Sequence, residues 1–155
     1  MILNFGMNTG ERKNKKMQAQ EFLRQLKKLD IMIQNKLIEK EQWRTIATGT
    51  TAQIGGERVQ TSSSQQKMAD AVGKYVDMEK EIDRIIDTLV DTRQDVIKVI
   101  ERLDLIEYDV LHKRYVQYLT FDEIADKCDK TYSHITTIHG RALKNVQKIL
   151  DARKD

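Results

Sequence analysis

Apolar residues recur at intervals of three and four along most of the chain, which is the period of an amphipathic helix. From about Glu11 to Ala47 they mark one face, at Phe22, Leu26, Leu29, Ile33 and Leu37. A second stretch, from about Lys67 to Arg102, has the same spacing, and its stripe extends to Leu103. Its apolar positions are Tyr75, Met78, Ile82, Ile85, Leu89, Val96, Ile100 and Leu103. Two long helices are therefore predicted, with a seam of the kind found in coiled coils.

The segment Thr48–Gln66 separates these helices and has the composition of a loop. It contains a Gly-Gly pair, a run of three serines and few apolar residues. Its length exceeds what a tight helical connection needs, so flexibility is expected. Such a loop lets the two helices fold back antiparallel. Ile31, Met32 and Ile38 widen the stripe of the first helix, which predicts that this helix is covered on more than one side.

The distribution of charge supports the pairing of the two helices. Residues 11–45 contain ten Lys and Arg against five Asp and Glu, a net of +5, whereas residues 68–104 contain six against ten, a net of −4. Opposite charges favour contact between the first helix and the second. The pattern leaves open whether the seam closes within one chain or is shared in part with a second copy, as in a homodimer through the hairpin.

Capping patterns predict shorter helices after Leu103. Asp104 and Glu107 have the spacing of a capping box, which would open a helix over about residues 105–118. Thr120 and Glu123 repeat the pattern in its T-x-x-E form and would open a short second helix. The C-terminal third is therefore expected to be helical but divided into several pieces.

The last predicted helix follows a turn at Asp129-Lys130. Thr131 is expected to cap this helix, which runs from Tyr132 to about Leu150. Its buried stripe is predicted at Ile135, Ile138, Ala142, Val146 and Ile149, facing the short helix at Ile124, Ala125 and Cys128. A short helix, a tight turn and a longer helix form the geometry of a helix-turn-helix.

The outward positions of the last helix carry hydroxyl groups and positive charge. Residues 131–150 include three basic and no acidic residues. In a recognition helix the N-terminal part of this face meets base edges, and basic side chains further along contact phosphates. A glycine within it suits either close approach to DNA or tight packing. The predicted DNA contacts are Thr131, Tyr132, Ser133, His134, Thr136, Thr137, Gly140, Arg141, Lys144 and Lys148, with His139 as a further phosphate contact.

Several residues between 111 and 144 also follow a familiar spacing. They are Leu111-x-x-x-Tyr115, Leu119-Thr120-x-x-Glu123-Ile124-Ala125, Ile135 and Arg141-Ala142-Leu143-Lys144. This pattern resembles region 4 of bacterial sigma factors, and the resemblance implies a helix-turn-helix whose second helix reads promoter DNA. Asp129 departs from the glycine usual at the turn. Tyr132, His134 and Thr136 stand where arginines are common, so the target need not be a standard promoter element.

A wider likeness covers most of the chain. It rests on the basic first helix, on Ala47-Thr48-x-Thr50-Thr51, on Lys67-Met68-Ala69-Asp70-Ala71-Val72 with Val76-Asp77-Met78-Glu79, and on Ile138-His139-Gly140-Arg141-Ala142-Leu143. These segments are similar to small phage-encoded regulators of the RinA/ArpU-like group, which activate late genes. The resemblance implies control of transcription by binding double-stranded DNA, with contact to RNA polymerase.

Composition favours the same architecture. The chain has no proline, seven glycines and 33% charged residues, so long solvated helices are expected in place of a sheet. The expected fold class is all-α, with a flexible N-terminus at 1–10, a coiled-coil-like antiparallel hairpin at 11–103 with a loop at 48–66, and a helix-turn-helix domain at 104–155. Without a membrane span or signal peptide, and with the single Cys128, a cytoplasmic protein is expected.

No catalytic, cofactor or metal site is predicted, so an enzyme is not expected. His134 and His139 are five residues apart, about 140° around a helix, and do not face one ligand position. The Ser62–Ser64 run has no neighbouring histidine and acid, and Gly55-Gly56 lacks the rest of a phosphate-binding loop. Two alternatives to a transcription activator stay open. One is a DNA-packaging protein of small-terminase type, whose ring a particle mass would reveal, and the other is an adaptor that binds RNA polymerase without DNA.

Overall fold

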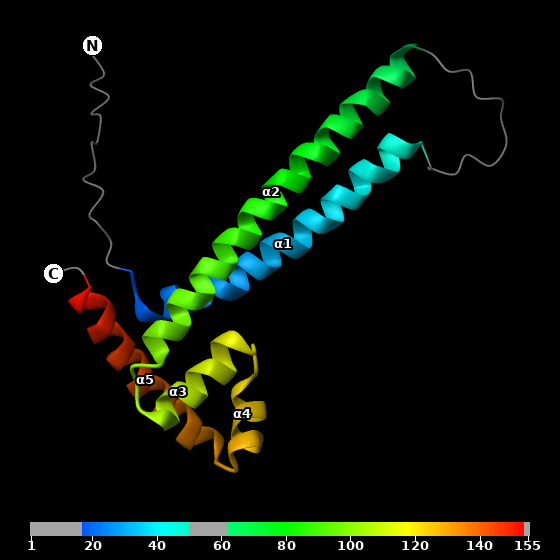
Figure 1. Cartoon of the computed structure of the whole chain (residues 1–155). Coiled ribbons are helices and arrows are strands. Elements are labelled where there is room, and N and C mark those ends of the chain that lie inside the picture. The colour runs from blue at the N-terminus through cyan, green and yellow to red at the C-terminus, as the bar shows by residue number, and fades with distance from the viewer. Residues whose placement is uncertain (1–16, 50–61, 154–155) are drawn as a thin grey trace, which may run out of the picture.

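Every regular element in residues 17–49 and 62–153, the part that the computed structural model describes, is helical (Figure 1). In chain order these elements are α1 (Ala19–Thr48), α2 (Ser62–Ile100), α3 (Leu105–Leu111), the π-helical turn η1 (His112–Val116), α4 (Phe121–Cys128) and α5 (Tyr132–Ala152). The expectation of an all-α fold, with a long antiparallel hairpin before a helix-turn-helix, is confirmed. No helix within these ranges has the length and apolar content needed to cross a lipid bilayer.

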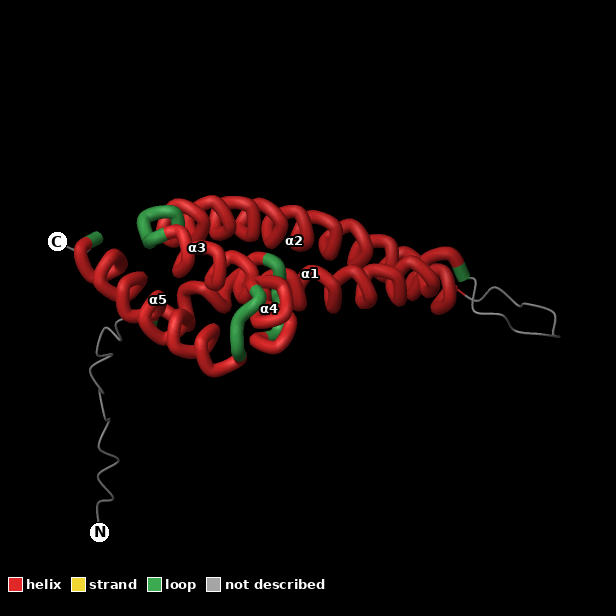
Figure 2. The backbone as a smooth tube through the Cα atoms, turned by 90° about the horizontal axis from the view of Figure 1, so that it is seen from below, coloured by secondary structure: helices red, strands yellow, loops and turns green. Residues whose placement is uncertain are grey.

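The hairpin consists of α1 and α2, which lie side by side in both ribbon views (Figures 1 and 2). Lys36 Nζ lies 2.9 Å from Glu81 Oε1, and Lys40 Nζ lies 2.9 Å from Glu79 Oε1. The predicted attraction between the basic and the acidic helix therefore takes the form of ion pairs across the seam. Because their carboxylates are half exposed, these pairs mainly set the register of the helices. Apolar residues buried along the outer part of the seam are Ile33, Ala71 and Ile82.

α1 begins later than the apolar pattern predicted. The backbone of Gln18 is extended, and its N–H donates to Glu21 Oε2 at 3.3 Å, so the helix starts at Ala19 and not near Glu11. The preceding stretch offers little apolar surface to bury, and Met17 is exposed. Residues 11–16 of the predicted helix, and the N-terminus at 1–10 that was expected to be flexible, lie outside the described residues.

α2 begins earlier than predicted. Ser62–Gln66, which the loop composition assigned to the connection, form the first residues of the helix. Serine is favoured near a helix N-terminus, where its hydroxyl can bond to free backbone N–H groups. At the other side of the connection α1 closes at Gly49, whose φ of 62° is left-handed and suits glycine. The rest of the predicted loop, residues 50–61, lies outside the described residues.

The outer face of α1 is not covered by any other part of residues 17–49 and 62–153. Ile31, Met32 and Ile38 are exposed, with Ile38 at 60%, although they were predicted to be buried on a second side. Along this part of the hairpin α2 is the main partner of α1, and one main partner covers only one face. Leu37, predicted in the seam, is exposed as well.

The main core joins the base of the hairpin to the C-terminal helices. Val99 and Ile100 end α2 inside this core, and α5 is further attached to the hairpin by polar contacts. The backbone N–H of Ala19 donates to Gln147 Oε1 at 2.7 Å, and Arg153 Nη1 lies 2.9 Å from Asp95 Oδ1. The buried set comprises Ala19, Phe22, Leu23, Leu26, Val96, Val99, Ile100, Leu111, Tyr115, Val116, Ala142, Val146 and Leu150. The hairpin and the C-terminal unit are therefore one packed body.

A second, smaller core holds the C-terminal helices together. Its buried residues are Val110, Ile124, Ala125, Ile135 and Ile138, with Leu119, Phe121 and Cys128 packed against them. This is the predicted contact between the inner face of α4 and the stripe of α5. The stripe differs at its end, since Leu150 is buried and Ile149 only partly so.

The predicted helix over 105–118 is shorter and irregular. α3 passes at His112 into η1, and the chain reverses at Tyr118, whose φ is 60°. Asp104 Oδ1 accepts a hydrogen bond from the Glu107 N–H at 2.8 Å, as predicted. The Glu107 carboxylate does not return to Asp104, because it is bound by α5 instead. Only half of that predicted capping box forms.

Candidate nucleic-acid interface

The start of α4 is fixed by hydrogen bonds between residues three apart. Thr120 Oγ1 accepts from the Glu123 N–H at 3.2 Å, and Glu123 Oε2 accepts from the Thr120 N–H at 2.7 Å. The predicted capping box is complete here. The bond from the Thr120 backbone favours the ionised carboxylate and holds the pKa of Glu123 below its usual value.

The turn between α4 and α5 is built from polar residues. Asp129 adopts a left-handed conformation with φ 52°, which aspartate tolerates better than most residues other than glycine. The Lys130 N–H then donates to the Ala125 carbonyl at 3.0 Å and closes α4. Thr131 Oγ1 accepts from the His134 N–H at 3.1 Å and opens α5, as predicted. Local side chains thus set the angle at which α5 leaves the turn.

The residues predicted to contact DNA share the outward side of α5 and its cap. Two of them, Thr136 and Gly140, are half-buried. The other eight are exposed: Thr131, Tyr132, Ser133, His134, Thr137, Arg141, Lys144 and Lys148. The hydroxyls of Thr136 and Thr137 each donate to the Ser133 carbonyl at 2.9 Å. Each threonine therefore presents a methyl group and oxygen lone pairs, and it no longer has a free donor.

Packing against the rest of the described structure does not require a glycine at position 140. A Cβ atom built at this position meets nothing within 4 Å. The sequence suggested two reasons for a glycine in this helix, close approach to DNA or tight packing. Tight packing against another described element is therefore excluded. The position offers open backbone surface on the same side of α5 as Thr136 and Thr137.

Residues 99–148 match the family Sigma-70, region 4. The matched segment starts at the end of α2 and includes α3, η1, α4 and most of α5. It supports a DNA-binding, transcription-related role for this region 4-like unit, whereas most of the hairpin lies outside it. No curated protein and no solved structure matches the chain.

His139 in the region 4-like unit does not have the outward position predicted for it. It is 9% exposed, and its Nε2 lies 2.8 Å from the hydroxyl of Tyr115. Its ring stacks on Tyr115 and meets Phe121 edge-on, with centroids 4.9 Å apart. Burial, together with the positive charges of Arg114 and Arg24, lowers its pKa to about 4. A neutral, enclosed imidazole is not a phosphate contact, so that assignment is wrong.

Arg141 is anchored by a buried acid that sequence reasoning did not single out for this role. Its Nε donates to Glu107 Oε1 at 2.6 Å, and Asn145 Nδ2 donates to both oxygens of that carboxylate at 3.0 Å. Glu107 is only 2% exposed, while the Arg141 side chain remains 56% exposed. Arg141 therefore joins α5 to α3 through Nε, while its Nη2 lies 3.8 Å from the exposed Asp104 carboxylate.

Arg114 and Phe121 form a further contact beside the predicted DNA face. The guanidinium of Arg114 lies 4.5 Å from the Phe121 ring centroid and donates to the Leu119 carbonyl at 2.9 Å. Phe121 in turn meets Tyr132 edge-on, with centroids 5.9 Å apart. These residues connect η1, α4 and the first residue of α5. Arg114, Phe121 and Tyr132 are separated along the chain, and no sequence pattern predicted that they are in contact.

Proposed function

We propose that this protein is a sequence-specific DNA-binding transcription regulator that places the N-terminal half of α5 in the major groove. The observation that carries the proposal is the exposed hydroxyl-rich and basic side of α5 on a region 4-like helix-turn-helix. Thr136 and Thr137 face the base edges. Because their hydroxyls already donate to Ser133, they accept hydrogen bonds from adenine or cytosine amino groups and offer methyl groups to thymine.

Phosphate contacts then orient the helix along the groove. Lys144 and Lys148 lie one and two turns beyond Gly140 and are exposed. The outer nitrogens of Arg141 join them, while Tyr132, Ser133 and His134 lie at the end of α5 that enters the groove. Phosphate contacts supply affinity without sequence information, and base contacts supply the discrimination.

The regulator is proposed to be a phage or prophage late-gene activator that acts with RNA polymerase. The likeness of the chain to RinA/ArpU-like regulators supports this finer proposal. The hairpin extends away from α5 (Figure 1), which leaves its tip clear of DNA for polymerase. Exposed Ile38, further along the hairpin, also suits a homodimer in which a second copy covers it.

Replacing Thr136 and Thr137 by alanine tests the base contacts. The double variant is expected to lose about tenfold or more in discrimination between the selected site and random DNA, because a bidentate base contact contributes about 1–3 kcal/mol and each threonine makes a weaker, single one. The site comes from selection of bound fragments out of random duplexes, and discrimination is the ratio of the two dissociation constants. A matched control is Thr45→Ala with Thr88→Ala, which removes two similar hydroxyl bonds to the preceding turn on the hairpin. An unchanged ratio in the Thr136/Thr137 variant refutes the base-reading role.

Replacing Lys144 and Lys148 by alanine tests the phosphate contacts. The plot of log K against log salt is expected to flatten by about two units, since each phosphate contact contributes about 0.9. Discrimination should stay near that of the wild type. Lys74→Ala with Lys80→Ala removes the same charge from exposed positions on α2 and should leave the slope unchanged. If both double variants keep the wild-type slope, Lys144 and Lys148 do not touch DNA.

A further inference from the structure

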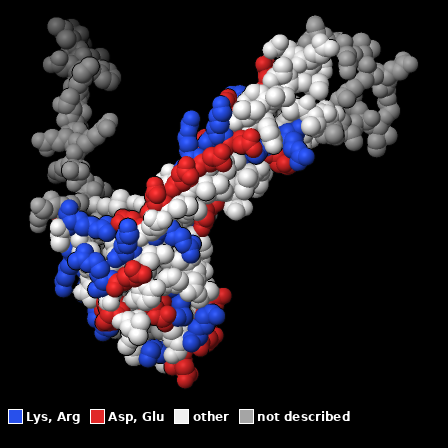
Figure 3. Space-filling model, in the orientation of Figure 1, with Lys and Arg blue, Asp and Glu red and all other residues white. Residues whose placement is uncertain are grey.

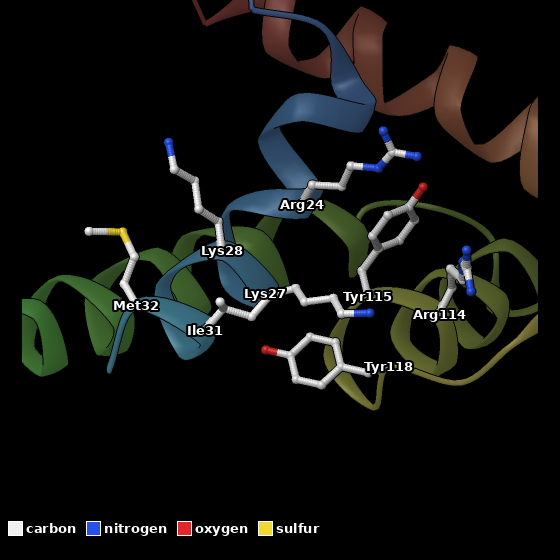
Figure 4. A pocket seen from close by; sticks show the side chains of 8 residues that line it. All are labelled: Arg24, Lys27, Lys28, Ile31, Met32, Arg114, Tyr115 and Tyr118. Carbon is white, nitrogen blue, oxygen red and sulfur yellow. The ribbon is translucent and has the colours of Figure 1, made fainter. Parts of the chain in front are cut away.

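A groove lies between the first half of α1 and the segment around η1 (Figure 4). Its volume is about 470 Å³. The α1 side contributes Arg24, Lys27, Lys28, Ile31 and Met32, and the opposite side contributes Arg114, Tyr115 and Tyr118. In Figure 4 the Arg24 guanidinium points toward Tyr115 and Arg114, and Lys27 extends between the two tyrosine rings. The groove is therefore cationic, with an apolar end at Ile31 and Met32.

The four basic side chains of this groove have no ion-pair partner in the part of the chain that the structure describes. Further along α1 the situation is different, because Lys36 and Lys40 are paired with glutamates of α2. Asp30 is the acidic residue on α1 nearest in sequence to Lys28, and it accepts a hydrogen bond from the Tyr118 hydroxyl. In Figure 3 basic side chains lie among acidic ones over this globular end of the molecule, and an acidic stripe runs along the hairpin.

The groove is continuous with the side of α5 proposed to contact DNA. Arg114 lines the groove and also stacks on Phe121, which in turn contacts Tyr132 at the start of α5. Arg24 lies close enough to His139 of α5 to help lower its pKa. One surface thus runs from the helix N-terminus across Arg114 to α1.

We propose that this groove binds the sugar-phosphate backbone of the duplex that α5 reads, so that α1 holds the DNA flanking the site. This inference rests on the proposed function. Duplex DNA carries one negative charge per about 1.7 Å of its axis. A row of phosphates therefore fits the row of unpaired cations in the groove better than a single anion does. Ile31 and Met32 then lie against deoxyribose. The first turns of α1 belong to the main core, so the cations are held in place on a packed helix.

The test uses the full chain and two lengths of duplex. One duplex ends at the base pairs covered by α5, and the other extends by about ten base pairs, one helical turn, on each side. Lys27→Ala with Lys28→Ala is the chosen variant, because both lysines are exposed, whereas Arg114 stacks on the Phe121 ring. On the long duplex its salt slope is expected to fall by about two units, at 0.9 per phosphate contact. On the short duplex, and in the Lys74/Lys80 control, the slope should match the wild type.

Random-sequence duplexes separate this inference from the proposed function. If the wild type shows no preference for any site, sequence-specific regulation fails, yet the slope on long random DNA still reports whether the groove binds phosphate. If the wild type prefers its site and the Lys27/Lys28 variant keeps the full slope on the long duplex, the groove is not a DNA contact. If the Lys27/Lys28 variant keeps the full salt slope on the long duplex but no longer binds an acidic peptide that the wild type binds, the groove belongs to a protein partner. That result would overturn the inference.

Discussion

Replacing Arg141 by alanine is expected to lower the free energy of unfolding by about 2 kcal/mol, more than any other exposed substitution on α5. The substitution leaves Glu107, 2% exposed, without its cationic partner. Removing one partner of a buried ion pair typically costs about 3–5 kcal/mol. The cost here is smaller because Asn145 still donates to both carboxylate oxygens and the Arg141 side chain is partly solvated. Denaturant unfolding, with midpoint and slope fitted together, measures the change.

Two further variants show whether the lost stability comes from the buried charge. Lys144→Ala removes a neighbouring exposed cation from the same helix and is expected to change stability by less than about 0.5 kcal/mol. Adding Glu107→Gln to Arg141→Ala removes the unpaired charge, so the double variant should be more stable than Arg141→Ala alone. Equal destabilisation by Arg141→Ala and Lys144→Ala would refute this account. In that case, weaker DNA binding by Arg141→Ala would result from the loss of contacts between Arg141 and DNA and not from misfolding.

Stability is expected to fall by about 2–3 kcal/mol from pH 6.5 to pH 4 through His139 alone, given about 1.4 kcal/mol per unit of pKa difference. The folded protein holds the pKa of His139 at about 4, against an ordinary value of 6.5. Between these values the unfolded chain binds a proton that the folded chain does not, so acid favours unfolding. Well above pH 6.5 both states carry the neutral imidazole and this dependence vanishes. Unfolding curves at half-unit intervals of pH record the change.

A pair of glutamine substitutions isolates the contribution of His139 from that of the carboxylates. His139→Gln cannot titrate, so its stability should decline less steeply than that of the wild type between pH 6.5 and pH 4. His134→Gln replaces the exposed histidine on the same helix and is expected to keep the wild-type pH dependence. Parallel curves for wild type and His139→Gln would show that burial of this imidazole has no energetic consequence.

Features set by neighbouring residues were predictable from the sequence. The Thr120–Glu123 box, the turn at Asp129 and the Thr131 cap depend on hydrogen bonds between residues at most five apart. Their physics is contained in a short window of sequence. The seam of the hairpin was predictable for a related reason, because a single period repeated over many turns outweighs errors at individual positions. Ser62–Gln66 were misassigned since their small polar side chains suit both a loop and a helix start.

Features set by distant residues were not predictable. Glu107 and Arg141 are 34 positions apart, and Tyr115 and His139 are 24 apart, so neither contact leaves a periodic signal. Both depend on the angle at which α5 crosses α3 and η1. The cationic groove requires in addition that α1 passes beside η1, which follows from the shared core and not from any motif. Exposure of Ile31 and Ile38 similarly reflects how many helices surround α1.

The shared core also gives the hairpin a mechanical property. Phe22 and Leu26 of α1 pack in the same buried cluster as Ala142 and Val146 of α5, so no joint separates the arm from the helix proposed to read DNA. With 30 residues, α1 is about 45 Å long, and the part beyond Leu26 forms the arm. A protein that binds the far end of this arm and displaces it sideways therefore also rotates α5, because the two move together. A small displacement at that end tilts α5 against the base pairs.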